Sequence, residues 1–126
     1  MPSAVSHPIP RTGCWARPVR GIVGTMLPAP AICLGVDPGS LACGWAVVSR
    51  SGSRLELLEA GVIRSPRGSD FDQRIKGIHD RLTAVIAVHQ PGFMAVESPF
   101  VEKNAATALK LGQIRGGILL LSLIHI

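Results

Sequence analysis

Residues 32–40 read ICLGVDPGS, an apolar run that closes in a tight turn. The first five of these residues form a short apolar segment of the kind found in buried strands. The next four are turn formers, because Asp37 can bond the local backbone, Pro38 fixes φ and Gly39 tolerates positive φ. We therefore predict a strand that ends at an aspartate. Taken alone, an ordinary turn explains this aspartate as well as a functional site does.

Two further extended segments follow this turn. Residues 44–48, GWAVV, lie at hairpin distance from the first strand, and residues 54–64 come after a Ser51-Gly52 turn. Short connections of this kind join antiparallel strands. The sequence thus predicts three antiparallel strands in succession.

A helix is predicted after the break at residues 65–69, with Ser69 or Asp70 as its cap. Its apolar positions keep a 3.6-residue period, which gives the helix one face that can cover a sheet. These positions are Phe71, Ile75, Ile78, Leu82, Val85 and Ile86. The Gln90-Pro91-Gly92 segment ends the helix.

Residues 93–97, FMAVE, form another apolar run, most simply a strand that returns parallel to the first through the helical crossover. A second helix is predicted from Lys103 to about Leu121, although Gly112, Gly116 and Gly117 weaken it. The resulting order, β-β-β-α-β-α, places the chain in the α/β class with a mixed sheet.

Two acids follow strands that can lie in the centre of this sheet. If the strands of Asp37 and Glu97 are neighbours, both side chains meet at one edge, where open α/β sheets place their ligand sites. We expect Glu97 to be partly buried and to need a partner, since it closes an apolar strand. Two such carboxylates repel each other unless a cation or a proton intervenes. Oxygen ligands on adjacent strands suit Mg²⁺.

The composition limits the class of protein. The chain has 126 residues, of which 47% are hydrophobic and 17% charged, so it is long enough for one globular domain and too apolar for a disordered chain. Its net charge of +5 is compatible with a phosphate-rich partner. Cys14, Cys33 and Cys43 form no CxxC pair and are expected to be ordinary thiols in a reducing compartment. No apolar run approaches the length of a membrane helix, so we expect no membrane span.

Four ordered motifs resemble one family. The segments CLGVDPGSLACGWAVV, GVIRSP, QPGFMAVESPF and KNAATALKLGQIRGG are similar to the N-terminal part of the RuvC family, the bacterial Holliday junction resolvases of the ribonuclease H-like superfamily. The similarity runs from about Leu34 to Leu120, in register and in order. It implies a ribonuclease H-like mixed sheet.

The resemblance also implies roles for individual residues. The aspartate of the first strand and the glutamate of the fourth are metal-binding catalytic residues in that family, and they correspond to Asp37 and Glu97. Phe100 matches an aromatic residue that the family uses against junction bases. Lys103 and Asn104 match a segment near the DNA.

Lys110 is a further candidate for DNA contact. The spacing of Lys103, Lys110 and Arg115 does not form a clean helical stripe, so solvated surface charges explain them as well. Phe100 could equally be a core residue, although the adjacent Pro99 favours an exposed loop.

The activity implied by the resemblance is symmetrical nicking of a four-way DNA junction by a homodimer, with two Mg²⁺ ions in each active site. The family also implies recombination and DNA repair in the cytoplasm, with the branch-migration proteins RuvA and RuvB as partners. Two-fold symmetry of the dimer would match that of the junction.

Three regions are expected along the chain. Residues 1–30, rich in Pro and Arg, are interpreted as a disordered leader or as the product of a mis-called start, with Met26 as the alternative first residue. Residues 31–120 form the N-terminal part of the nuclease domain, and residues 121–126 are interpreted as a tail encoded by a sequencing adapter. The family's later metal ligands have no counterpart here. We therefore expect a C-terminally truncated, poorly soluble chain without cleavage activity.

Two competing functions remain open from the residues. One is an actin-like or sugar-kinase ATPase, in which an aspartate, a glycine and a second strand also come after the first strand. Nucleotide binding would identify such a protein. A module that binds junction DNA without cutting it is the other, and salt-dependent binding without metal-dependent cleavage would identify that.

Overall fold

The computed structural model describes residues 30–98 and 104–126. In chain order its elements are β1 (Ala31–Asp37), β2 (Ala42–Ser51), β3 (Arg54–Arg64), α1 (Phe71–His89), β4 (Phe93–Val96) and α2 (Ala105–His125). The predicted order of three strands, helix, strand and helix is therefore confirmed. Residues 1–29 of the predicted leader, Phe100 and Lys103 lie outside the described residues.

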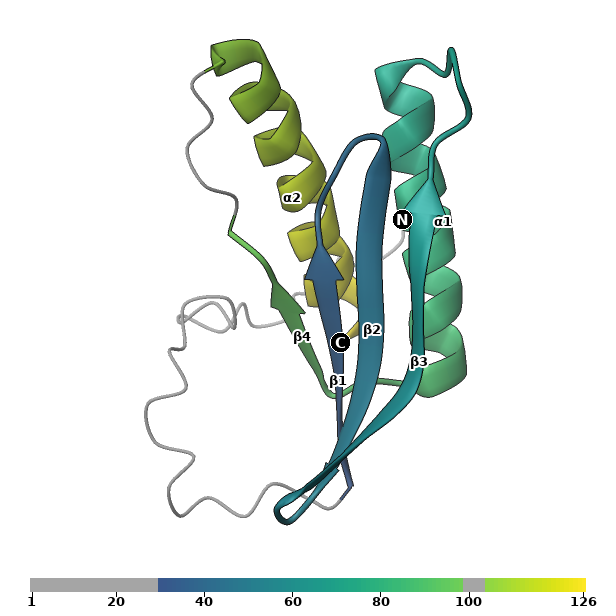
Figure 1. Cartoon of the computed structure of the whole chain (residues 1–126), viewed down its shortest axis with the longest axis vertical. Helices are drawn as coiled ribbons and strands as arrows, with labels where there is room; N and C mark the ends of the chain where they lie inside the picture. The colour runs from purple at the N-terminus through teal and green to yellow at the C-terminus, as the bar shows by residue number, and fades with distance from the viewer. Residues whose placement is uncertain (1–29, 99–103) are drawn as a thin grey trace, which may run out of the picture.

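The four strands form one mixed sheet in the order β3-β2-β1-β4 (Figure 1). β1 pairs with β2 and β2 with β3 in antiparallel fashion, whereas β1 and β4 are parallel. The crossover from β3 to β4 runs through α1, as parallel neighbours require. β1, which carries the aspartate, thus lies between β2 and β4.

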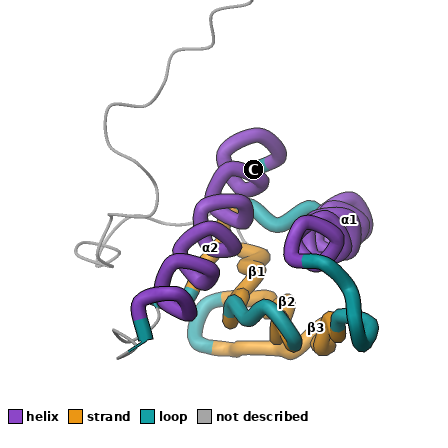
Figure 2. Tube along the Cα trace, turned by 90° about the horizontal axis from the view of Figure 1, so that it is seen from above, coloured by secondary structure: helices purple, strands orange, loops and turns teal. Residues whose placement is uncertain are grey.

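Both helices pack on the same face of the sheet (Figure 2). The predicted stripe of α1 supplies part of the core, because Ile78, Leu82, Val85 and Ile86 are buried. Strands and α2 supply the remaining buried side chains: Leu34, Val36, Cys43, Trp45, Val47, Ile114, Ile118 and Leu121. One hydrophobic core thus lies between the sheet and the helix pair.

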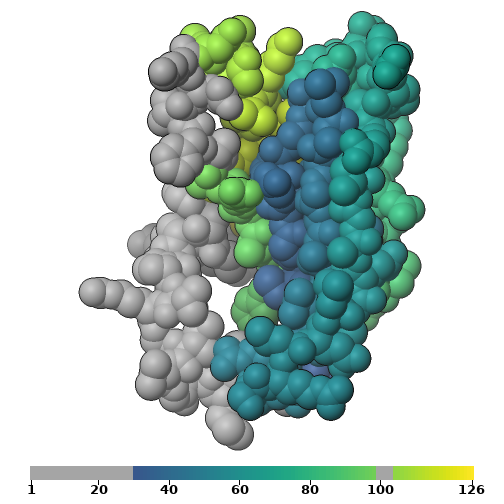
Figure 3. Space-filling view, in the orientation of Figure 1, coloured from purple at the N-terminus to yellow at the C-terminus, as the bar shows by residue number. Residues whose placement is uncertain are grey.

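The other sheet face, which we call the open face, is covered by neither helix (Figures 2 and 3). Residues paired across strands share a face of the sheet. Cys33 pairs with Val48 and Phe93, and Val48 pairs with Leu57, so this row lies on the open face. Leu57 is 63% exposed and Leu55 is 68% exposed.

Several element boundaries differ from the prediction. β2 extends beyond residues 44–48 in both directions, because its register with β1 and β3 continues through the flanking residues. α2 begins at Ala105 after the cap Asn104, and it continues past the predicted end at Leu121 as far as His125. Leu121 is only 2% exposed, and this core contact favours the longer helix.

α2 is also long and apolar enough, by length and composition, to cross a membrane, with a mean hydropathy of 1.3 in its most apolar window. The sequence had predicted no such helix. A core helix of a soluble protein passes the same test, and Ile114, Ile118 and Leu121 of α2 lie in the core. This one helix therefore does not indicate a membrane protein.

Candidate functional site

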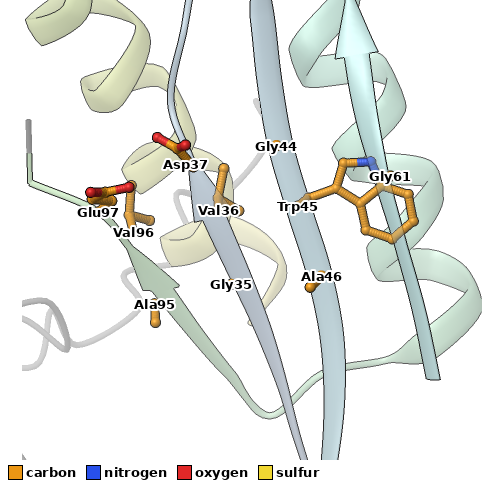
Figure 4. Close-up of a pocket in the computed structure, with 10 residues that line it drawn as sticks. All are labelled: Gly35, Val36, Asp37, Gly44, Trp45, Ala46, Gly61, Ala95, Val96 and Glu97. Atoms are coloured by element: carbon orange, nitrogen blue, oxygen red, sulfur yellow. The ribbon is translucent and has the colours of Figure 1, made fainter. Parts of the chain in front are cut away.

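Asp37 and Glu97 lie side by side at the carboxyl ends of the parallel neighbours β1 and β4 (Figure 4). Val36 pairs with Val96, and the backbone N–H of Glu97 donates a hydrogen bond to the carbonyl oxygen of Val36 at 2.9 Å. The predicted convergence of the two acids is thus observed. The expected partial burial of Glu97 is wrong: β4 ends at Val96, and the glutamate side chain is exposed beyond it.

The predicted need of Glu97 for a partner is met by Asp37. A hydrogen bond between the two carboxyl groups and the charge of Asp37 raise the pKa of Glu97 above its usual value, with a smaller effect of desolvation. A raised pKa means that the pair holds a proton more readily than an isolated glutamate. A bound cation would relieve the same repulsion.

A shallow hollow of about 630 Å³ extends from the carboxyl pair across the sheet. Most residues of its floor have small side chains or none: Gly35, Gly44, Ala46 and Ala95 on the open face, with Gly61 beside the ring of Trp45 (Figure 4). Gly44 pairs directly with Asp37. The backbone of the sheet is therefore accessible beside the acids.

These floor residues were not identified as functional from the sequence. Part of this floor could have been found from strand alternation. Gly35 and Ala95 each lie two residues before an acid and therefore on the same face of the strand as that acid. The pairing of Gly35 with both Ala46 and Ala95 depends on strand register, which single-strand patterns do not reveal.

The donors at the site suit a hard cation. Among the described residues, no group of three or more His, Cys, Asp or Glu side chains could hold a metal ion, so the pair stands without a third ligand of these types. Mg²⁺ commonly takes one or two protein carboxylates and completes its shell with water and substrate phosphate. Asp37 and Glu97 fit that requirement in donor type and number.

The predicted DNA-contact residues fall in different places. Asn104 is the N-cap of α2, where its side-chain oxygen accepts hydrogen bonds from the backbone N–H groups of Ala106 at 2.9 Å and Thr107 at 3.3 Å. Lys110 is exposed, and its ammonium group lies 5.9 Å from the ring centroid of Phe71 at the start of α1. Both residues therefore have structural contacts that the sequence did not indicate.

Comparison with known proteins identifies relatives over most of the described chain. The family profile described as "Crossover junction endodeoxyribonuclease RuvC" matches residues 33–125. The RuvC proteins of Chloroherpeton thalassium and Oleidesulfovibrio alaskensis are 44% identical over 92 residues and 48% identical over 83 residues. These alignments include 73% and 66% of this chain, and 50% and 49% of the relatives. The chain thus spans about half the length of the curated relatives it matches.

Solved structures give the same result for the fold. The chain is similar to "T. thermophilus RuvC in complex with Holliday junction substrate", with a TM-score of 0.70 and 27% identity. A second structure of Thermus thermophilus RuvC gives a TM-score of 0.66 at the same identity. Each match includes 75% of this chain and 58% of the solved chain. The predicted ribonuclease H-like sheet is confirmed by this agreement.

Proposed function

The chain belongs to the RuvC family of crossover junction endodeoxyribonucleases, and from that premise we propose that it supplies the first part of the catalytic site of a Holliday junction resolvase. The observation that carries the proposal is the meeting of Asp37 and Glu97 at the ends of two parallel strands. The actin-like or sugar-kinase alternative is not retained, because the family match includes both acids.

Asp37 and Glu97 would hold Mg²⁺, and the family resemblance implies two ions in each complete site. When bound, such ions activate the attacking water and stabilise the leaving 3′ oxygen of the cut strand. The raised pKa of Glu97 supports this role, because the charge of Asp37 that raises it is a repulsion that a bound cation would relieve.

The shallow hollow gives the scissile strand a route to the acids. Because Gly35, Gly44 and Ala95 leave little side-chain bulk, a sugar-phosphate backbone can approach the carboxylates closely. The net charge of +5 is compatible with a polyanionic partner. Phe100, Lys103, Asn104 and Lys110 remain proposed DNA contacts, and four-way junction DNA is the proposed substrate.

We propose a homodimer in which α2 contributes to the interface. Leu109 and Leu120 on this helix are 65% and 57% exposed, and Gly112 and Gly116 are exposed between them. Small residues between apolar ones allow two helices to approach closely. A two-fold dimer would present two active sites to the two-fold symmetry of a junction. A cytoplasmic location and RuvA and RuvB as partners are proposed from the family alone.

The chain as it stands is proposed to be inactive in cleavage. Two carboxylates hold a cation loosely without further ligands, and among the residues that the structure describes no third His, Cys, Asp or Glu joins the pair. Junction binding without cleavage is thus the expected behaviour of this chain in isolation.

Paramagnetic Mn²⁺ tests the metal site directly. Added to the ¹⁵N-labelled chain, Mn²⁺ is expected to broaden the backbone amide signals around Asp37 and Glu97, and Asp37→Asn is expected to abolish that broadening. In a separate assay, the chain is incubated with a four-way junction in the presence of Mn²⁺ or Mg²⁺, and cleavage of the DNA is measured. Broadening that is centred elsewhere, or that survives Asp37→Asn, would refute the proposed site. Metal-dependent nicking by the wild-type chain would refute the proposed inactivity.

A further inference from the structure

Ser65 links the end of β3 to the turn that follows Asp37. Its hydroxyl group donates a hydrogen bond to the carbonyl oxygen of Ser40 at 2.9 Å, and its backbone N–H donates to the carbonyl oxygen of Leu41 at 3.0 Å. β3 is not a neighbour of β1 in the sheet, so this link crosses the end of β2. The half-buried Ser65 is therefore joined by two bonds to the turn beside the acids.

The turn itself is closely packed. Pro38 is buried, and a Cβ added at Gly39 would come within 2.2 Å of the carbonyl oxygen of Ala42. Cys43, which follows the turn at the start of β2, is fully buried in the core. Only four residues separate β1 from β2, so Ser40 lies three residues after Asp37 in the same turn.

The two bonds of Ser65 differ in what they require. The backbone bond extends the ladder beyond the pairing of Ala42 with Arg64, and almost any residue could make it. The bond to Ser40 requires a hydroxyl group. Only this second bond depends on the identity of the side chain, and only Ser or Thr can place a hydroxyl group at this distance from the backbone.

We propose that Ser65 is a positioning residue of the carboxylate site, which fixes the turn after β1 and through it the side chain of Asp37. Glu97 is attached to β1 and not to this turn, because its backbone N–H donates to the carbonyl oxygen of Val36. Loss of the Ser65 hydroxyl group therefore changes the position of one acid relative to the other. This role rests on the proposed binding of a divalent cation by the pair.

The test compares Ser65→Ala, Ser65→Thr and Ser65→Val in the full 126-residue chain. Ser69→Ala is the matched control, because the Ser69 hydroxyl group bonds to Pro66 in the same loop and not to the turn. Mn²⁺ affinity is measured from the broadening of amide signals, and the signals of residues 38–42 are recorded without metal. The unfolding midpoint of every variant is measured in parallel.

Ser65→Ala is expected to weaken Mn²⁺ binding about tenfold, as the loss of a residue that orients a metal ligand does. It should also shift the amide signals of the turn, whereas Ser65→Thr and Ser69→Ala should behave as the wild type. If Ser65→Ala does not fold, the Mn²⁺ affinities of Ser65→Thr and Ser65→Val are compared instead. Both new side chains are branched at Cβ and differ mainly in the hydroxyl group.

Unchanged Mn²⁺ affinity and unchanged turn signals in Ser65→Ala would overturn the proposal. An equal loss of Mn²⁺ affinity in Ser69→Ala would overturn it too, since a general disturbance of the loop would then explain the effect of Ser65→Ala. If the wild-type chain shows no Mn²⁺ binding that depends on Asp37, the proposed function fails first. The positioning role is then tested by the metal-free amide signals of Asp37 and the turn alone. Signals that shift in Ser65→Ala but keep their wild-type positions in Ser65→Thr support it.

Discussion

The carboxyl group of Glu97 binds its proton more tightly than an isolated glutamate, because Asp37 hydrogen-bonds to it and adds its negative charge. We predict that Asp37→Asn lowers the pKa of Glu97 toward the usual value, since the amide is neutral and can donate to the carboxylate. Carboxyl ¹³C shifts recorded over a pH series measure this change. An unchanged pKa of Glu97 in Asp37→Asn would contradict it.

The same shift has a defined consequence for stability. A pKa that is raised on folding stabilises the folded state below the unfolded pKa, and this contribution is lost as pH rises through the higher folded pKa. The contribution of Glu97 to the free energy of unfolding should therefore decrease between acidic and neutral pH. Urea titrations at several pH values measure the free energy of unfolding, which should decrease less with rising pH in Asp37→Asn than in the wild type. An identical dependence on pH in both proteins would contradict this prediction.

Gly61 has no room for a side chain. A Cβ at this position would lie 2.9 Å from the ring of Trp45, a buried core residue. We predict that Gly61→Ala lowers the free energy of unfolding by about 1–3 kcal/mol, as overpacking does. Gly77→Ala is the control on α1, where nothing lies within 4 Å, and it should add about 0.5–1 kcal/mol. Chemical denaturation distinguishes the two, and equal effects would refute the steric argument.

At the scale of the elements, Asn104 fixes the start of α2. Its side-chain oxygen accepts two backbone hydrogen bonds, from Ala106 and Thr107. We predict that Asn104→Ala lowers the free energy of unfolding by about 1 kcal/mol, because these N–H groups lose their acceptor. Asn104→Asp keeps the acceptor and should retain the stability.

The same pair of variants tests the proposed contact of Asn104 with DNA. The added negative charge of Asn104→Asp should weaken junction binding, most clearly at low salt, while the cap stays intact. Fluorescence anisotropy with a labelled junction measures the effect beside the denaturation curves. If Asn104→Ala is as stable as the wild type, the cap is not a significant stabilising contact. If Asn104→Asp binds the junction normally, the contact with DNA is excluded.

Elements with a strong local pattern could be predicted from the sequence. α1 was predictable because Ile78, Leu82, Val85 and Ile86 repeat with the helical period. β1 and β4 were predictable because short apolar runs end at turn formers. The parallel return of β4 followed from the crossover, and with it the meeting of Asp37 and Glu97.

Features that depend on contacts between distant segments could not be predicted. The full length of β2 follows from its register with two partners, and the last turn of α2 is favoured by the burial of Leu121. The bond of Ser65 to Ser40 joins residues that no local pattern connects. Glu97 is exposed although its strand is apolar, because the strand ends one residue before it.

At the scale of the whole molecule, the open face carries several exposed apolar side chains. Leu55, Leu57 and Val62 of the edge strand β3 are more than half exposed, and Phe93 of β4 is 46% exposed. Edge strands with exposed apolar side chains promote association between chains. The isolated chain is therefore expected to self-associate.

A charge on this face should oppose the association. We predict that Leu57→Lys lowers the self-association constant about tenfold, equivalent to roughly 1.4 kcal/mol. Val88→Lys is the matched control, because Val88 is 75% exposed on α1, away from the open face. Analytical ultracentrifugation of both variants and the wild type measures the effect. A wild-type chain that is monomeric with one sharp unfolding transition would contradict the prediction.

The parallel pairing of β1 with β4 also sets the order in which the site is assembled. The β1–β2–β3 meander is continuous in sequence and can form from local contacts as the chain leaves the ribosome. Glu97 arrives only after α1 has been synthesised and β4 has paired with β1. The pKa of Glu97 therefore reports on folding. It rises only when β4 has paired with β1, because this long-range pairing brings Glu97 to Asp37.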